Sequence, residues 1–232
     1  VSLGETRAAS ALVDALRRQR PGLRLLLTHG TATGRAAGAA LLRDGDAQCW
    51  LPWDTPGAVR RFLQHQRPAI GVLMETEIWP NLLAGARRYK VPTVLANGRL
   101  SLRSARGYAR FSALVRPAFA ALSGVAAQTP RDAERLSALG AGPVEVCGNL
   151  KFDVPPPVGK ITLGSEWKKP VGQRPIWLAA STREGEEVLV LEAWRQVCVP
   201  DLLLVVVPRH PQRFDEVAGL LQRQGLRLAR RS

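Results

Sequence analysis

Short apolar runs alternate with longer helical stretches along most of the chain, and this alternation limits the fold more than any other feature. Apolar runs of strand length occur at residues 23–28, 69–74, 92–96, 123–127 and 144–147. Helical patterns occur at residues 35–42, 78–89 and 131–139, and Gly140 is a suitable C-cap for the last of them. Short buried strands that alternate with helices are typical of a parallel sheet covered on both faces. The sequence therefore predicts an α/β fold with doubly wound parallel sheets.

Residues 154–175 interrupt this alternation. The segment is rich in Pro, Gly and Lys and lacks apolar periodicity, so we predict an interdomain linker. The alternation resumes with strand patterns at 176–180 and 202–207, helical patterns at 184–197 and 212–224, and the start of a strand at 226–229. We expect one Rossmann-like domain over residues 1–153 and the beginning of a second, incomplete one over residues 176–232. Ligands of such sheets bind beyond the carboxyl ends of the strands, so we expect a ligand cleft between the domains.

The charge balance favours anionic partners. The chain holds 33 Lys and Arg against 19 Asp and Glu, a formal net charge of +14, which suits nucleic acid, phosphorylated substrates or an acidic membrane surface. A coding preference for Arg explains the excess about as well. No apolar run has the length of a membrane-spanning helix, and no signal peptide opens the sequence. The three cysteines form no C-x-x-C pair and the three histidines no H-x-x-x-H spacing, which argues against a disulfide framework and a metal site.

Glu5 is the first candidate for catalysis. It precedes a helix expected to begin near Thr6, where a carboxylate faces the predicted cleft. A carboxylate whose pKa is raised toward neutrality by burial removes a proton from a substrate hydroxyl. An acidic residue that simply favours the positive end of a helix explains the same position, and on local sequence alone this second interpretation is the stronger.

Glu75 and Glu77 are the second candidates, because they directly follow the apolar run at 69–74. Two carboxylates at the end of a buried strand need partners, and Arg99, after the next strand, is suitably placed. An Arg–Glu pair that only fixes the loops is as good an interpretation as a functional one. A glycosidase carboxylate pair and a divalent-cation site are further alternatives, although a cation needs more oxygen ligands.

Two basic side chains of the N-terminal half follow strand patterns. The segment 30–35 has the glycines and hydroxyls of an anion site at a helix start, and Arg35 adds charge, although an ordinary turn explains it about as well. Lys151 lies just before the predicted linker, where it either contacts an anionic substrate or is a solvated turn residue.

The C-terminal half offers two more polar segments at strand ends. Ser181 and Thr182 precede a helix and, with Arg183, suit a phosphate, although a capping box explains them too. The segment Pro208–Arg209–His210 follows the apolar run at 202–207 and favours a phosphate or nucleotide contact, with a plain turn as the alternative.

Taken in order, six motifs resemble those of the 3-deoxy-D-manno-octulosonate (Kdo) transferases of lipopolysaccharide assembly. They are SLGE, ETEIWPN, NGRLS, GNLKFD, STREGEE and PRHP, and the resemblance extends from Ser2 to about Phe214. The resemblance implies a GT-B glycosyltransferase with two Rossmann-like domains. It implies transfer of Kdo from the donor substrate CMP-Kdo to a hydroxyl of a phosphorylated lipid A precursor, with inversion and with no metal or other cofactor. It also implies a location at the cytoplasmic face of the inner membrane, against an anionic membrane surface.

The resemblance further implies roles for residues. The glutamate of the family's GE motif, its general base, falls on Glu5, beside Gly4. The residues held to stabilise the transition state fall on Glu75 and Lys151. The pair that contacts CMP falls on Pro208 and Arg209. We expect five further substrate-binding residues: His210, Ser181, Thr182, Arg35 and Arg99. Arg35 and Arg99 either contact acceptor phosphates or position Glu75.

The sequence departs from the family at both ends. Members begin with a hydrophobic anchor and a first strand, and near their end carry an N-x-x-E-P segment that holds the nucleotide ribose; we interpret this sequence as a fragment without either. Position 3 is Leu where Val is common. A GT-B transferase for another acidic CMP-sugar is the nearest alternative. A nucleic-acid-binding module is disfavoured, because no basic stripe is interleaved with aromatic residues.

Overall fold

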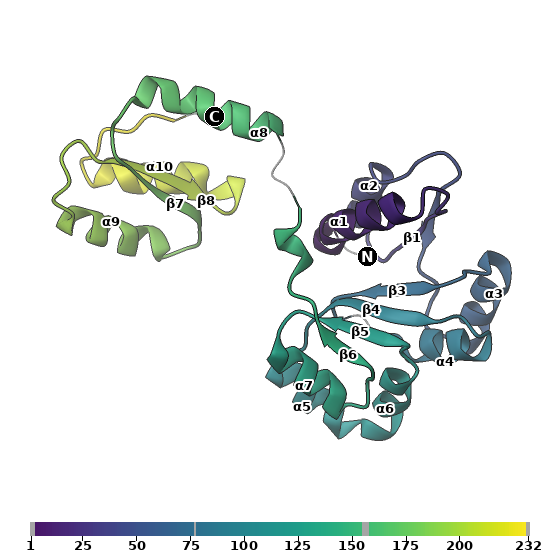
Figure 1. Ribbon diagram of the computed structural model, residues 1–232. Helices are drawn as coiled ribbons and strands as arrows, with labels where there is room; N and C mark the ends of the chain where they lie inside the picture. The colour runs from purple at the N-terminus through teal and green to yellow at the C-terminus, as the bar shows by residue number, and fades with distance from the viewer. Residues whose placement is uncertain (1–2, 77, 155–157, 231–232) are drawn as a thin grey trace. The chain divides into compact units, whose positions relative to one another are not determined.

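A computed structural model describes residues 3–76, 78–154 and 158–230. The chain divides into two compact units, Val1–Pro155 and Pro156–Ser232, which are described separately below (Figure 1). All strand pairs in both units are parallel. This arrangement confirms the predicted α/β class.

The first unit contains two parallel sheets. The larger one has the strand order β3-β4-β5-β6, and the smaller one pairs β1 with β2. The strands are β1 (Leu26–His29), β2 (Ala47–Trp50), β3 (Gly71–Met74), β4 (Thr93–Gly98), β5 (Gly124–Ala127) and β6 (Val144–Val146). The helices are α1 (Leu3–Gln19), α2 (Ala32–Ala39), α3 (Pro56–Gln66), α4 (Pro80–Arg88), α5 (Leu102–Arg110), α6 (Ser112–Ala120), α7 (Pro130–Ala138) and the 3-10 turn η1 (Leu150–Phe152).

Helices cover both faces of the larger sheet, as successive residues of β4 show. Leu95 packs in the main core with side chains of α4, α6 and α7. Its neighbour Ala96 packs in a separate cluster with Met74 and with Ala8 and Ala9 of α1. Because successive side chains of a strand point to opposite faces, α1 lies on the face opposite the other three helices (Figure 1).

The smaller sheet is joined to α1 by a buried ion pair. Arg17, near the end of α1, pairs with Asp46, which precedes β2, and both side chains are buried. The Asp46 carboxylate also accepts the backbone N–H groups of Leu25 and Arg43, each at 2.8 Å. Burial alone would raise the pKa of Asp46, but these N–H groups and Arg17 together hold that pKa below its usual value.

The second unit contains one pair of parallel strands, β7 (Ile176–Thr182) and β8 (Leu203–Pro208). Its helices are α8 (Val158–Lys168), α9 (Glu186–Gln196) and α10 (Phe214–Arg223), with the 3-10 turns η2 (Lys169–Val171) and η3 (Pro211–Arg213). The core of this unit is formed by Leu191 of α9 with Val217 and Leu221 of α10, against which side chains of β8 pack.

Some sequence predictions for these elements are wrong. The segment 154–175, predicted to lack periodic structure, contains α8 and η2. The apolar residues of α8 do not gather on one helix face, so no helical pattern marks this segment. The strand predicted at 226–229 is absent, since these residues are irregular. The sequence analysis also missed β2, α3, α5 and α6; α5 in particular contains few apolar residues.

In the described parts of the chain, none of the helices is both long enough and apolar enough to cross a membrane.

Gly85 of α4 lies where this helix packs closely on α3. A Cβ atom added there would lie 2.6 Å from Val59 Cγ1 and 3.1 Å from Leu63 Cδ1, and both of these side chains are buried. We predict that Gly85→Ala lowers the free energy of unfolding by about 1–3 kcal/mol, the usual effect of overpacking a core. The measurement is the urea midpoint.

Gly107→Ala is the matched control, because a Cβ atom there meets nothing within 4 Å and the residue lies inside helix α5. Removing a helical glycine should leave stability unchanged or raise it by about 0.5–1 kcal/mol. Equal destabilisation by both substitutions would contradict the assignment of the effect to the α3–α4 contact.

Candidate functional site

Glu75 is a buried carboxylate in an unusual backbone conformation. It directly follows β3, its residue is 6% exposed, and its φ of 58° lies in the left-handed region. Its backbone N–H donates to the carbonyl of Ala96 on β4 at 3.0 Å, and its own carbonyl accepts the N–H of Arg99 at 3.3 Å. A non-glycine residue in this conformation is strained and is held there by its surroundings.

Two cations compensate the charge of Glu75. Arg99 Nη2 lies 2.9 Å from Glu75 Oε2, and Lys151 Nζ lies 3.8 Å from Glu75 Oε1. The Arg99 and Lys151 side chains are 55% and 52% exposed, whereas that of Glu75 is only 7% exposed. The cluster therefore carries one excess positive charge and presents it to solvent, which suits an anionic ligand. The predicted Arg99–Glu75 pair is confirmed.

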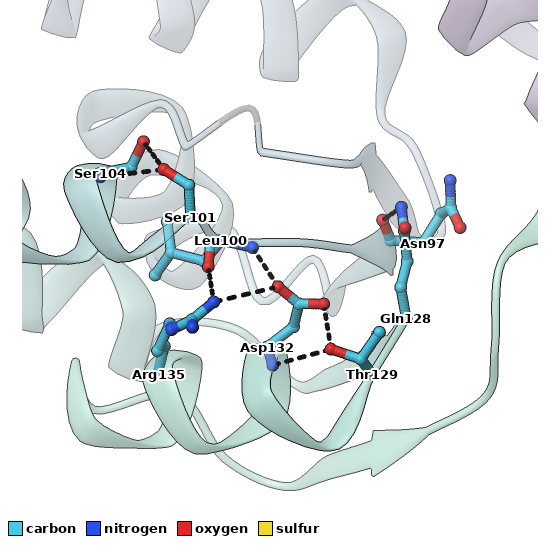
Figure 2. Close-up of polar contacts among 8 residues, drawn as sticks. All are labelled: Asn97, Leu100, Ser101, Ser104, Gln128, Thr129, Asp132 and Arg135. Carbon is cyan, nitrogen blue, oxygen red and sulfur yellow. Dashed lines mark hydrogen bonds and ion pairs between the residues drawn. The ribbon is translucent and has the colours of Figure 1, made fainter.

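The loop that carries Arg99 is fixed from α7. Asp132 accepts the N–H of Leu100 at 2.8 Å, and Arg135 donates to the carbonyl of Leu100, also at 2.8 Å (Figure 2). Thr129 caps α7 by accepting the N–H of Asp132, and its hydroxyl donates to the Asp132 carboxylate. Because Asp132 is buried and fully used in these bonds, its role is to hold the loop.

Three polar side chains hold the turn that carries Lys151. Asn97, which is 2% exposed and has a φ of 54°, accepts the N–H of Leu150 through its side-chain oxygen at 3.1 Å. Gln128, which follows β5, donates to the Asn97 carbonyl at 3.0 Å and accepts from the Asn149 amide at 3.1 Å (Figure 2 shows the first of these bonds). These bonds join the ends of β4, β5 and β6, so the ammonium of Lys151 is placed by neighbouring strands.

Glu5 lies on the side of the sheet that α1 covers. It occupies the first turn of α1 and is half-buried. Residues three and four positions apart share a helix face, so Glu5 lies on the same face as Ala8 and Ala9, which pack against Met74 at the end of β3. Gly4, in the same turn, is exposed. The structure therefore places Glu5 on the helix face that is directed toward the strand preceding Glu75.

Arg35 does not join the Glu75 cluster. It lies in α2 with its guanidinium 5.1 Å from the ring centroid of Trp50, a cation–π contact. Thr31 caps α2 by accepting the N–H of Gly34 at 3.1 Å, so the turn predicted as an anion site forms a capped helix start.

In the second unit, the predicted residues gather where β7 and β8 end. Ser181 is exposed and has a φ of 62°, and a register irregularity separates Ala180 from Thr182. The N–H of Arg209 donates to the carbonyl of Thr182 at 2.9 Å, which joins the two strand ends.

The remaining predicted side chains of the second unit border these strand ends. Pro208 ends β8, and Arg209 and His210 follow it with exposed side chains. The alternative interpretation of Ser181 and Thr182, a capping box, does not hold: α9 begins at Glu186 after Gly185, and the Glu186 carboxylate accepts the N–H of Arg183 at 2.8 Å.

A buried ion pair supports this second edge. Arg213 donates to both oxygens of Glu187, at 2.9 and 3.1 Å, and Glu187 is 2% exposed. Burial works to raise the pKa of the Glu187 carboxyl, but the hydrogen bonds and charge of Arg213 outweigh it and hold that pKa below its usual value.

Glu77, the second carboxylate predicted after β3, lies outside the described residues. No group of three or more His, Cys, Asp or Glu side chains suited to a metal gathers within residues 3–76, 78–154 and 158–230. The sequence analysis missed Gln128 and Asp132, although Gln128 directly follows a strand and was therefore detectable by the rule used for the other candidates.

Comparisons with known proteins identify the family. Residues 1–154 match the family model described as 3-deoxy-D-manno-octulosonic-acid transferase (kdotransferase). The chain belongs to this family. It is 48% identical over 242 aligned positions to a 3-deoxy-D-manno-octulosonic acid transferase of Bordetella pertussis and 37% identical over 239 positions to one of Haemophilus influenzae. Both alignments cover 100% of this chain but only 56% and 55% of the relatives, so the chain spans about half their length.

Solved structures confirm the fold of the Kdo transferase family chain. A UDP-GlcNAc 2-epimerase from Neisseria meningitidis matches with a TM-score of 0.65 at 13% identity, covering 96% of this chain and 67% of that one. A putative UDP-N-acetylglucosamine 2-epimerase from Listeria monocytogenes matches with a TM-score of 0.63 at 16% identity, covering 95% and 64%. At such identities the likeness concerns the fold alone, and it confirms the GT-B class predicted from the motifs.

The backbone strain at Glu75 is measurable with a pair of substitutions. Glu75→Ala and Glu75→Gly both remove the carboxylate, but only alanine retains the cost of a left-handed φ. We predict that the glycine variant is more stable than the alanine variant by about 1–2 kcal/mol, measured by urea unfolding. At Ala84, an exposed helical position of α4, replacement by glycine should instead destabilise by about 1 kcal/mol. A less stable glycine variant at position 75 would show that the strain is absent.

The Glu187–Arg213 pair predicts a pH dependence of stability. Because the pKa of Glu187 is lower in the folded state than in the unfolded one, its ionised form stabilises the fold near neutral pH. This contribution is lost as the pH falls through the folded-state value. Glu187→Gln should therefore be clearly less stable than the parent at pH 7, and the difference should shrink at pH values below 4.5, the carboxyl's ordinary value.

Glu192→Gln is the matched control, an exposed carboxylate on the same helix. It should change the urea midpoint little at either pH. A stability difference between the parent and Glu187→Gln that does not depend on pH would refute the assignment to this ion pair.

Proposed function

We propose that the protein is a glycosyltransferase that moves Kdo from CMP-Kdo to a hydroxyl group of a phosphorylated lipid A precursor in lipopolysaccharide assembly. Family membership supports the class of reaction, and the relatives carry the name 3-deoxy-D-manno-octulosonic acid transferase. The observation that carries the proposal in this chain is the Glu75 cluster. Its two partly exposed cations, held at the carboxyl edge of the sheet, suit an acidic sugar and a phosphorylated acceptor.

Glu5 is the proposed general base. An acceptor hydroxyl has to lose its proton as its oxygen bonds to the anomeric carbon of Kdo, and a carboxylate within hydrogen-bond reach accepts that proton. Attack on the face opposite the bond to CMP inverts the anomeric centre. The position of Glu5 on the α1 face that packs toward the end of β3 supports this role.

Lys151 and Glu75 are proposed to stabilise the transition state. In such a displacement negative charge moves toward the leaving phosphate, and the donor carboxylate adds a permanent negative charge. A positive group already fixed in place lowers the energy of that arrangement without reorganisation. Glu75 keeps Lys151 and Arg99 oriented, and both cations keep an exposed side for the substrate.

The second unit is proposed to bind the CMP portion. Ser181 and Thr182 end β7 shortly before α9. Pro208 ends β8, Arg209 and His210 follow it, and the N–H of Arg209 bonds to the carbonyl of Thr182. Thr182 is buried, so the groups here that suit a nucleotide phosphate are the exposed Ser181 hydroxyl, backbone N–H groups and the Arg209 guanidinium. In this proposal these groups compensate the negative charge of the departing CMP, so no metal is required.

The proposed place of work is the cytoplasmic face of the inner membrane. A lipid-anchored acceptor is confined to a membrane, and the net charge of +14 favours an anionic leaflet.

Glu5→Gln tests the proposed base. In the full-length protein this change should lower the rate of Kdo transfer by about 100-fold or more, from the lower end of the usual range for general-base catalysis upward, while CMP binding remains within about twofold. The rate is followed by mass spectrometry of the lipid product and CMP binding by calorimetry. Asp14→Asn, an exposed carboxylate two to three turns further along the same helix, should leave both unchanged. Near-normal transfer by Glu5→Gln would show that another group is the base.

A further inference from the structure

Helix α5 lies on the surface, and few of its apolar side chains pack against the core. None of its residues is buried. Only Ala105 and Tyr108 pack against the main core, and the Tyr108 ring meets the edge of Phe119 at a centroid distance of 5.9 Å. The other apolar side chains at this helix and at its junction with α6 face solvent: Leu102 is 50% exposed, Phe111 69% and Leu114 64%.

The same helix carries arginines that have no carboxylate partner in the described structure. Arg103, Arg106 and Arg110 are all exposed, and none forms an ion pair with a described Asp or Glu. The surrounding sequence cannot supply such partners locally, because residues 78–131 contain no Asp or Glu. This span contains nine basic residues: Arg87, Arg88, Lys90, Arg99, Arg103, Arg106, Arg110, Arg116 and Arg131.

We propose that these side chains form a docking surface for an anionic lipid bilayer. The α5–α6 surface consists of Arg103, Arg106 and Arg110 together with Leu102, Phe111 and Leu114. Arginines beside exposed Leu and Phe match the two layers of a membrane interface, because the guanidinium groups meet anionic headgroups while the apolar side chains enter the acyl boundary. The complementarity of charge identifies the occupant as an anionic bilayer rather than a neutral one.

A nucleic acid fits this surface less well. Binding of single strands combines a basic groove with aromatic rings free to stack on bases. Here the Tyr108 ring is engaged with Phe119, and Phe111 is the one ring exposed on the α5–α6 surface.

The surface is rigidly joined to the Glu75 cluster. Arg99 pairs with Glu75, and three residues later the chain enters α5. Asp132 and Arg135 fix Leu100 between them, and Ser101 caps α5 by accepting the N–H of Ser104 at 3.1 Å (Figure 2). Docking of α5 thus brings the Glu75 edge close to headgroup level, where a lipid-anchored acceptor presents its hydroxyl. This consequence rests on the proposed function; the docking itself does not.

The test is vesicle co-sedimentation of the 232-residue chain in the absence of donor and acceptor. The vesicles are pure phosphatidylcholine or phosphatidylcholine with one third phosphatidylglycerol. We expect binding to the anionic vesicles only. The triple variant Arg103→Gln, Arg106→Gln, Arg110→Gln should bind about 100-fold more weakly, since each arginine near an anionic surface contributes about fivefold. Phe111→Ser with Leu114→Ser should lower binding by at least about tenfold.

The matched control removes three charges elsewhere. Arg20, Arg60 and Arg61 are exposed arginines outside the α5–α6 surface. Their triple replacement by Gln changes the net charge equally and should alter binding by less than about fivefold, the contribution of a single arginine at the membrane surface. Circular dichroism establishes that each variant is folded.

Three outcomes overturn the proposal. One is equal loss of binding in both triple variants, which would assign binding to net charge alone. Another is unchanged binding of the Phe111→Ser, Leu114→Ser variant, which would exclude insertion of apolar side chains. The third is that the protein binds single-stranded RNA in preference to vesicles, and that the α5 triple variant abolishes this RNA binding. Because no sugar donor is present, each outcome is independent of whether the protein transfers Kdo.

Discussion

The ion-pair cluster around Glu75 organises the first unit. An isolated carboxylate buried at the end of a parallel strand is strongly unfavourable, so two cations have to reach it from other segments. Arg99 comes from the loop after β4, and Lys151 comes from the turn after β6. The hydrogen bonds of Asp132, Gln128 and Asn97 all serve to fix these two segments. The polar residues at this edge form one connected arrangement, in which Glu75 orients the cations that face solvent.

Both units contain residues with left-handed backbone conformations near the ends of their strands. Glu75 directly follows β3, Asn97 and Ser181 are the last-but-one residues of β4 and β7, and all three have positive φ values near 60°. This conformation turns the chain abruptly and keeps polar side chains at the strand edge instead of continuing the sheet. Its energetic cost is tolerated because surrounding hydrogen bonds and ion pairs fix the backbone. Functional edges of parallel sheets are where such local strain is expected.

Sequence reasoning predicted the larger sheet and most of its candidate side chains, for a physical reason. Buried parallel strands are short apolar runs, and the polar residues that follow them meet at one edge. It missed α5, a short helix that packs only Ala105 and Tyr108 on the core, and it took α8 for a linker because the apolar residues of α8 do not gather on one helix face. The role of Asp132 depends on a contact with Leu100, 32 residues away in sequence, which no local pattern encodes. The cation–π contact of Arg35 with Trp50 is likewise not encoded locally, because it requires the pairing of β1 with β2.

We propose that the carboxyl edge of the larger sheet, with the Glu75 cluster, serves Kdo transfer to a lipid. The most direct measurement is a mass-spectrometric transfer assay on the full-length protein, with CMP-Kdo generated in situ, a tetra-acylated lipid A precursor as acceptor and no added metal. We expect a lipid product heavier by one or more Kdo units. A protein that binds CMP yet yields no heavier lipid would contradict it, and would direct the search to another acidic CMP-sugar or another acceptor.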